Sequence, residues 1–147
     1  MENKDFESVV DSLFSILPVF SKKLIRPDKY NENIGLSQSH FQVLFLIEDS
    51  EQLSISEIGK QLCISKPNMT PIVRKLINKK LIKKIRNEED KRYINIKLTK
   101  KGKELIEKHK ESVTNNLKSK LLDLEDNDIT DLSISLKTVK EILLKIE

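Results

Sequence analysis

Between residues 54 and 98 the apolar positions of this chain change from helical spacing to strand alternation, which limits the fold more than any other feature. Ser54 and Glu57 match a capping box, in which two side chains satisfy backbone donors at the start of a helix. Ser65 can cap a second helix, with only a tight turn before it. The two short helices predict a helix-turn-helix, with Gly59 where another helix crosses closely.

The alternating part of this segment has the pattern of a β-hairpin. Ile94, Ile96 and Leu98 alternate with polar residues, and the residues before them have the composition of a turn. Thr99 can then cap a long helix. The sequence therefore predicts a mainly α-helical fold with a small β-hairpin wing, that is, a winged helix-turn-helix DNA-binding domain over residues 36–102.

Amphipathic helices are expected on both sides of this domain, over residues 1–35 and 103–147. Apolar residues recur there at spacings of three and four, which places them on one stripe of a helix. Pro18 predicts a kink in the first helix, and Arg26-Pro27 predicts its end. Such stripes must be covered, and the last one has the seam pattern of a coiled-coil contact. We expect them to form a homodimer through Phe6, Val10, Leu13, Leu17, Leu132, Leu136, Val139, Leu143 and Ile146.

Charge is strongly separated along the chain. Residues 60–103 hold 15 of the 27 lysines and arginines but only three of the 23 acidic residues, so this segment has a net charge of +12. Such a patch attracts polyanions, and we favour a nucleic-acid backbone. The alternative is an adaptor that does not bind DNA, in which the terminal helices assemble with another protein and the basic patch meets an acidic partner.

The second helix of the helix-turn-helix has a basic and polar outer face without a carboxylate, and the major groove of DNA admits one helix. Asn68 could pair with adenine and Arg74 with guanine, although Arg74 and Lys75 could equally contact only phosphate. Pro71 lies past the first turn, so we expect an irregular start of the helix or a ring that touches a thymine methyl group. The residues expected at DNA are Ser65, Lys66, Pro67, Asn68, Thr70, Pro71, Arg74 and Lys75.

In the hairpin, Asp90 and Arg92 are two residues apart and are expected to point the same way at its base, where the carboxylate can orient the guanidinium. An arginine held in this way suits a narrow minor groove. The competing interpretation is an exposed ion pair with little energetic effect. The wing residues expected at DNA are Lys84, Arg86, Asp90, Lys91 and Arg92.

Several classes of function are disfavoured. The longest apolar run, residues 43–47, is far shorter than a membrane span, and the acidic N-terminus does not resemble a signal peptide, so we expect a cytoplasmic protein without a membrane partner. The single cysteine excludes an internal disulfide. We expect no metal, cofactor or enzymatic activity, because cysteine and histidine do not cluster at ligand spacing and His40 and His109 lack catalytic partners.

Together these motifs resemble the MarR family of winged-helix transcriptional regulators. The resemblance implies an obligate homodimer that binds a pseudo-palindromic operator in double-stranded DNA, with the second helix in the major groove and Arg92 in the flanking minor groove. We expect a repressor of transcription, with an activator as the alternative that the sequence leaves open. The resemblance also implies control by a small-molecule effector or by oxidation. It covers residues 36–102 through Leu36-Ser37, Gln42-Val43-Leu44, Leu53-Ser54-Ile55-Ser56-Glu57-Ile58-Gly59, Ile64-Ser65, Leu76, Leu81-Ile82, Asp90-Lys91-Arg92 and Leu98-Thr99-Lys100-Lys101-Gly102.

For an effector, the resemblance points to a pocket at Phe14, Leu17, His40, Phe41 and Phe45. Core packing explains these residues equally well and is the interpretation we prefer. For His40, satisfaction of a helix end is preferred over ligand contact.

The chain departs from the family pattern at several positions. Lys80 stands where the family usually has glycine, which predicts a strained or altered turn. Lys84 and Lys91 replace common arginines, which keeps the charge but loses the planar fork. The first helix lacks the cysteine of peroxide-sensing relatives, and for Cys63 we expect a packing role rather than a redox role.

Overall fold

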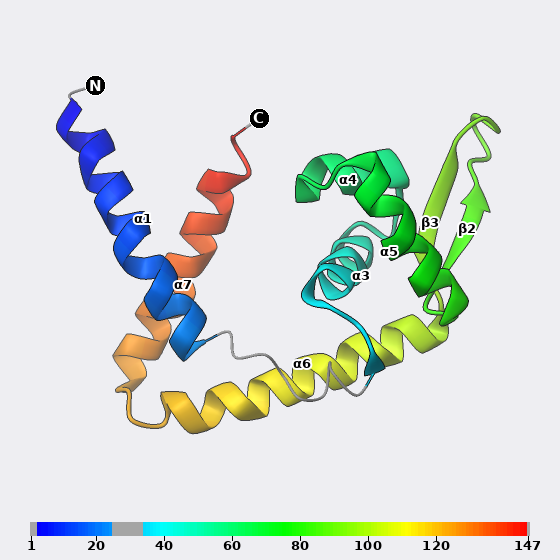
Figure 1. Ribbon diagram of the computed structural model, residues 1–147. Helices are drawn as coiled ribbons and strands as arrows, with labels where there is room; N and C mark the ends of the chain where they lie inside the picture. Colours follow the sequence, from blue (N-terminus) through cyan, green and yellow to red (C-terminus); the bar gives the residue numbers. More distant parts are fainter. Residues whose placement is uncertain (1–2, 25–33, 147) are drawn as a thin grey trace. The chain divides into compact units, whose positions relative to one another are not determined.

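The computed structural model describes residues 3–24 and 34–146, and it is mainly helical with one small antiparallel sheet (Figure 1). The predicted fold class, a winged helix-turn-helix with flanking helices, is confirmed. In chain order the elements are α1 (Asn3–Lys23), α3 (Gln38–Ser50), β1 (Gln52–Ser54), α4 (Ile55–Leu62), α5 (Lys66–Asn78), β2 (Ile82–Arg86), β3 (Ile94–Leu98), α6 (Lys100–Leu121) and α7 (Asp126–Leu143).

The chain forms two compact units. The helical unit contains residues 1–26 and 113–147, and the winged unit contains residues 27–112. Helix α6 contributes to both, because its residues up to 112 belong to the winged unit. The predicted functional division, 36–102 against 1–35 and 103–147, stays a prediction.

The sheet has three strands in the order β1-β3-β2. Leu53 of β1 and Lys84 of β2 both lie opposite Ile96 of β3. The hairpin of β2 and β3 was predicted, whereas β1 was not, because its three residues are too few to show alternation. Strand β1 covers the edge of β3 that the β2–β3 hairpin alone would leave open.

The hydrophobic core of the winged unit is assembled from every one of its elements. Leu44, Ile47, Ile58, Ile96 and Ile106 are all fully buried within it. Helix α6 enters this core through its first turns, and the helix-turn-helix closes it from another side. Gly59 lies against α5 as predicted: an added Cβ would come within 2.9 Å of the Ile64 carbonyl oxygen and 3.3 Å of Met69 Cγ.

The starts of α3 and α4 carry side-chain caps, whereas Ser65 stands at the N-cap of α5 without a side-chain hydrogen bond, so the cap predicted there is wrong. The Ser54 amide donates to a Glu57 carboxylate oxygen at 2.7 Å and the Glu57 amide donates to Ser54 Oγ at 3.2 Å, so the capping box is confirmed. At the start of α3 the Ser37 amide donates to His40 Nδ1 at 3.0 Å. His40 therefore caps the start of α3, which was the role preferred over ligand contact, and its side chain is buried, with a relative exposure of 8%.

The two helices of the helix-turn-helix end in the same motif. After α4 the left-handed residue is Cys63, with φ 53°, and after α5 it is Lys80, with φ 59°. In each case the next amide reaches back to the helix, Ile64 to Gly59 O at 2.9 Å and Leu81 to Leu76 O at 3.0 Å. These are Schellman motifs, which usually place glycine at the left-handed position. The predicted strain at Lys80 is confirmed, whereas Cys63 is exposed, so its predicted packing role is wrong.

The helical unit has no fully buried side chain among its described residues in α1 and α7. All nine side chains predicted for dimerisation lie in this unit, and all but Leu132 are exposed in the single chain. Helix α1 continues through Pro18 and ends at Lys23, whose carbonyl oxygen accepts Lys120 Nζ at 3.0 Å. The predicted helix end at Arg26-Pro27 lies outside the described residues, and the kink stays a prediction.

Candidate nucleic-acid interface

Helix α5 presents one apolar and one polar face. Met69, Val73 and Leu76 are buried against the core of the winged unit. The eight residues that sequence reasoning placed at DNA are all exposed, from Ser65 at the N-cap to Lys75 near the last turn. This outer face carries three cationic side chains and no acid, so nothing on it repels a phosphate backbone.

Pro71 lies inside a continuous helix. Helix α5 begins at Lys66, and the Thr70 hydroxyl donates to the Lys66 carbonyl oxygen at 3.1 Å, so the predicted irregular start is wrong. A proline at this position removes the amide that would pair with the Pro67 carbonyl four residues earlier. Pro67 and Pro71 are both exposed, so water can satisfy that carbonyl and the Pro71 ring is presented outward.

The loop between β2 and β3 is ordered by its own polar side chains. Asn87 Oδ1 accepts the amides of Glu89 at 2.9 Å and Asp90 at 3.3 Å, and the Tyr93 amide donates to the Asp90 carbonyl at 3.0 Å. Arg92 donates to Asp90 through Nε at 3.0 Å and through Nη2 at 2.9 Å. This two-point pair lies in the connecting loop and not at the base of the hairpin, which corrects the predicted position.

The geometry leaves the Arg92 guanidinium oriented but accessible. The side chain of Arg92 is 86% exposed, whereas that of Asp90 is 33% exposed. Hydrogen bonds from Arg92 lower the pKa of the Asp90 carboxyl, and the same contact raises the pKa of Arg92. Two of the five guanidinium N–H groups are used by Asp90, so three remain for an external acceptor.

The register of β2 and β3 divides the basic residues of the wing between the two faces of the sheet. Lys84 and Arg86 alternate onto the face of the sheet that carries buried Ile96, and Lys83 lies directly opposite Lys97 on the other face. All four basic side chains are exposed. Tyr93 and Ile94 are exposed as well, an apolar addition to the wing that sequence reasoning missed and that their position beside Arg92 could have indicated.

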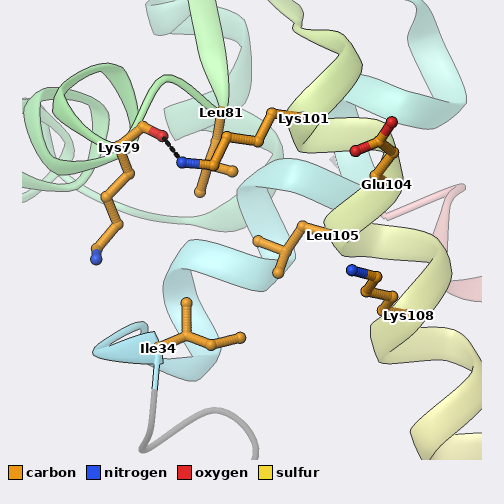
Figure 2. A pocket seen from close by; sticks show the side chains of 7 residues that line it. All are labelled: Ile34, Lys79, Leu81, Lys101, Glu104, Leu105 and Lys108. Carbon is orange, nitrogen blue, oxygen red and sulfur yellow. Dashed lines mark hydrogen bonds between the residues drawn. The ribbon is translucent and has the colours of Figure 1, made fainter.

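A pocket of about 260 Å³ lies at the end of α5, within the winged unit (Figure 2). Ile34, Leu81 and Leu105 give it an apolar lining, and Figure 2 shows the Lys101 ammonium donating to the Lys79 carbonyl oxygen, at 3.1 Å. The remaining lining residues are Glu104 and Lys108. This pocket was not predicted, because Lys79 on one side and Lys101 and Lys108 on the other come from segments far apart in the chain.

The residues predicted for an effector pocket divide between the two units. Phe14 and Leu17 are exposed on α1 in the helical unit. In the winged unit Phe41 is buried and stacks on His109, with ring centroids 4.1 Å apart. Phe45 is half-buried near the same imidazole, with centroids 5.7 Å apart. As a ligand pocket, the set stays a prediction.

The described residues contain neither a membrane-spanning helix nor a cluster of metal-binding side chains. None of the helices over residues 3–24 and 34–146 has both the length and the apolar character needed to cross a membrane. Within the same residues, histidine, cysteine, aspartate and glutamate do not gather in a group of three or more that could hold a metal ion.

Sequence comparisons point to one group of proteins. The family model described as MarR family matches residues 36–94. The HTH-type transcriptional regulator SarZ of Staphylococcus epidermidis is 34% identical over 88 residues, which cover 59% of this chain and 60% of SarZ. SarZ of Staphylococcus haemolyticus is 30% identical over 93 residues, which cover 63% of each chain. The chain thus spans about 60% of the length of the curated relatives it matches.

Solved structures share the fold at low sequence identity. A MarR family protein from Bacillus stearothermophilus has a TM-score of 0.76 at 18% identity, covering 99% of both chains. A mutant MarR from E. coli, complexed with operator DNA, has a TM-score of 0.67 at 23% identity, covering 91% of this chain and 96% of that one. FabT of Streptococcus pneumoniae in complex with DNA has a TM-score of 0.63 at 18% identity, covering 99% and 100%.

Proposed function

This chain belongs to the MarR family, and we propose on that premise that it is a homodimeric transcriptional regulator that binds double-stranded DNA in a sequence-specific manner. The single observation that carries the proposal is the pairing of an acid-free outer face on α5 with an arginine oriented by Asp90 on the adjoining wing. The relatives named above are regulators, and the proposal assigns this chain no catalytic activity.

In this proposal the first turns of α5 enter the major groove. Lys66, Asn68 and Thr70 stand there on the exposed face, with hydrogen-bonding groups that can reach base edges. Arg74 and Lys75 lie further along the same face, where phosphate contact is the simpler role. The wing places Arg92 in the flanking minor groove, where three of its N–H groups are available.

The homodimer is supported by the exposed apolar stripes of the helical unit. A dimer presents two copies of α5, so the preferred site should have dyad symmetry with half-sites about one helical turn apart. Selection from random duplexes followed by footprinting tests this directly. A protected site without dyad symmetry would contradict the dimeric reading of the proposal.

The role of the wing is tested through its two oriented residues. Arg92→Ala should weaken binding to every duplex about tenfold and reduce the slope of log affinity against log salt by about one. Asp90→Asn keeps the charge of Arg92 but leaves only one neutral acceptor oxygen to orient it, so affinity should fall while the salt slope stays the same. Lys83→Ala, on the other face of the sheet, is the matched control with a smaller expected effect.

The role of the helix is tested by base preference. Asn68→Ala should relax the preference at particular base pairs by about 1 to 3 kcal/mol and leave the salt slope unchanged. Binding to a library of single-base variants of the preferred duplex measures both quantities. A uniform loss across all positions would show that Asn68 contacts only the backbone.

The adaptor alternative has its own expectation. If the basic patch binds an acidic protein, the unmodified protein binds DNA only weakly and without sequence preference. Arg92→Ala then leaves that low DNA affinity unchanged. Fluorescence anisotropy at low and moderate salt on one duplex distinguishes the two functions, because only a DNA-binding regulator gains affinity from a selected sequence.

We further propose that the regulator represses transcription and that an organic anion modulates it through the pocket at the end of α5. Lys101 and Lys108 supply positive charge there, and Leu81 and Leu105 supply apolar surface. Benzoate should raise the melting temperature more than neutral benzamide, and Lys108→Gln should abolish that difference. Equal responses to both compounds would remove the support for an anionic effector.

A further inference from the structure

Three successive carbonyl groups after α5 all accept hydrogen bonds from the start of α6. The Lys79 carbonyl accepts Lys101 Nζ at 3.1 Å, the Lys80 carbonyl accepts Thr99 Oγ1 at 2.6 Å, and the Leu81 carbonyl accepts the Thr99 amide at 3.0 Å. The last carbonyls of α5 itself are satisfied locally, since Ile77 O accepts the Lys80 amide and Leu76 O accepts the Leu81 amide. The bonds from Thr99 and Lys101 therefore fasten the segment that follows α5 to the start of α6.

The Thr99 hydroxyl acts in both directions at this junction. It donates to the Lys80 carbonyl and accepts the Gly102 amide at 3.0 Å. The second bond is the N-cap of α6, since it satisfies a free amide in the first turn. The Thr99 hydroxyl therefore caps the start of α6 and also binds the carbonyl of Lys80, just after the end of α5.

Close packing leaves little freedom around this hydroxyl. A Cβ added at Gly102 would collide with the Leu81 carbonyl oxygen and lie 3.3 Å from Leu98 Cδ2. Lys80 is held in the left-handed conformation, with φ 59°. The two backbones thus meet directly, without a side chain between them.

We propose that Thr99 is a positioning residue for α5: its donor bond to the Lys80 carbonyl sets the angle at which the DNA-facing end of the helix is presented. This inference rests on the proposed DNA-binding function. Helix α5 has 13 residues, so its first turn lies about 20 Å from the junction at 1.5 Å per residue. A tilt of about 5° at the junction would move that turn by about 2 Å, which exceeds the roughly 0.5 Å spread of good hydrogen bonds.

A purely structural role of Thr99 predicts a different result. If Thr99 only caps α6, its loss lowers stability but leaves the folded protein with its normal preference among DNA sequences. The relevant measurement is therefore the discrimination ratio, that is, the affinity for the preferred duplex divided by that for an unrelated duplex. It is measured well below the melting temperature, where every variant is folded.

Three substitutions at Thr99 separate the donor from the cap. Thr99→Ser keeps both bonds and should hold the discrimination ratio within about twofold of the unmodified protein, Thr99→Asp keeps the cap but cannot donate, and Thr99→Val loses both. Thr99→Asp should lower the ratio about fivefold or more while the melting temperature falls by no more than about 3 °C. A normal ratio in folded Thr99→Asp overturns the proposal.

A second pair of variants repeats the test without touching the hydroxyl. Lys101→Met removes the bond to the Lys79 carbonyl, and Lys100→Met removes an equal charge from the neighbouring exposed position. Lys101→Met should lower the discrimination ratio about two- to threefold relative to Lys100→Met. Equal ratios in this pair contradict the positioning role even if no Thr99 variant folds.

Hydrogen exchange of backbone amides, measured in the protein without DNA, tests the Thr99 junction separately from the proposed DNA-binding function. The Lys80 and Leu81 amides donate to Ile77 O at 2.8 Å and to Leu76 O at 3.0 Å, and they should exchange faster in Thr99→Asp than in Thr99→Ser. Unmodified protein that binds no duplex at low salt refutes the DNA-binding function. Equal exchange in the two variants refutes the junction itself.

Discussion

The winged unit and the helical unit use the same kinds of apolar residue with opposite results. In the winged unit Leu44 and Ile96 are 0% exposed. In the helical unit Leu17 is 58% exposed and Val139 is 51% exposed, although both stand on regular amphipathic stripes. The winged unit closes its core within one chain, whereas the apolar stripes of the helical unit stay open to solvent.

In the proposed dimer, this difference makes the stability of the helical unit, but not that of the winged unit, depend on a second copy of the chain. Burying a large aliphatic side chain contributes about 1.5 to 3 kcal/mol. The winged unit gains this contribution as a single chain. The described helices of the helical unit can gain it only against a second surface, which in our proposal is the same unit of another copy.

The largest expected effect comes from placing charge on the open stripe. Val139→Asp combined with Leu143→Asp should raise the dimer dissociation constant by about two to four orders of magnitude, because two apolar contacts are lost and two carboxylates must be buried. Sedimentation across a concentration series measures this change. Lys137→Glu, away from the stripe, is the control, and an unchanged sedimentation profile of the double variant would refute dimerisation through α7.

A truncation in each unit sharpens the comparison. Ile96→Ala should lower the free energy of unfolding by about 2 to 5 kcal/mol at every protein concentration, since the cavity lies inside one chain. Leu143→Ala should have an effect that depends on concentration, because the lost contact is made between chains. Chemical denaturation at two concentrations at least a hundredfold apart distinguishes these outcomes; if both variants behave alike, the two units do not differ as described.

The left-handed residue after α5 provides a smaller test within the winged unit. Lys80→Gly should raise the free energy of unfolding by about 1 kcal/mol, because glycine adopts this conformation without steric cost. Lys79→Gly, at a residue with φ −79°, should instead lower stability. Thermal unfolding of the two variants measures both signs, and a loss of stability in Lys80→Gly would show that the lysine makes a compensating contact.

The smallest expected effect is a pH dependence confined to the winged unit. Burial, followed by Lys75 and Lys79, lowers the pKa of His40 below 6.5. The unfolded chain therefore takes up this proton first as the pH falls, so the contribution of His40 to stability is complete above pH 6.5 and is lost as the pH falls through the folded pKa.

His40→Gln tests that dependence because glutamine can still accept the Ser37 amide. The variant should show a weaker decrease in stability below pH 6.5 than the unmodified protein. His109 is present in both proteins, so the difference between their pH profiles isolates His40. Parallel profiles would contradict the assigned pKa direction.

Features that depend on neighbours in sequence were predicted well. The capping box of Ser54 and Glu57 and the pair of Asp90 and Arg92 each involve residues two or three apart. The predicted position of Asp90 and Arg92 at the base of the hairpin was wrong, because composition does not show at which residue two strands stop pairing. The continuous helix through Pro71 was also missed, since the cost of a lost hydrogen bond is small where water reaches the free carbonyl.

By itself, the sequence determined where helices and the hairpin form, which face of α5 is free of acid, and which stripes are apolar. Those properties follow from hydrogen bonds and side-chain spacing within a few residues. The tertiary structure alone decided that β1 pairs with β3, that Phe41 stacks on His109, and that Thr99 holds the end of α5. Such contacts join residues 19 or more positions apart, and they form only when packing of the whole core brings two backbones together.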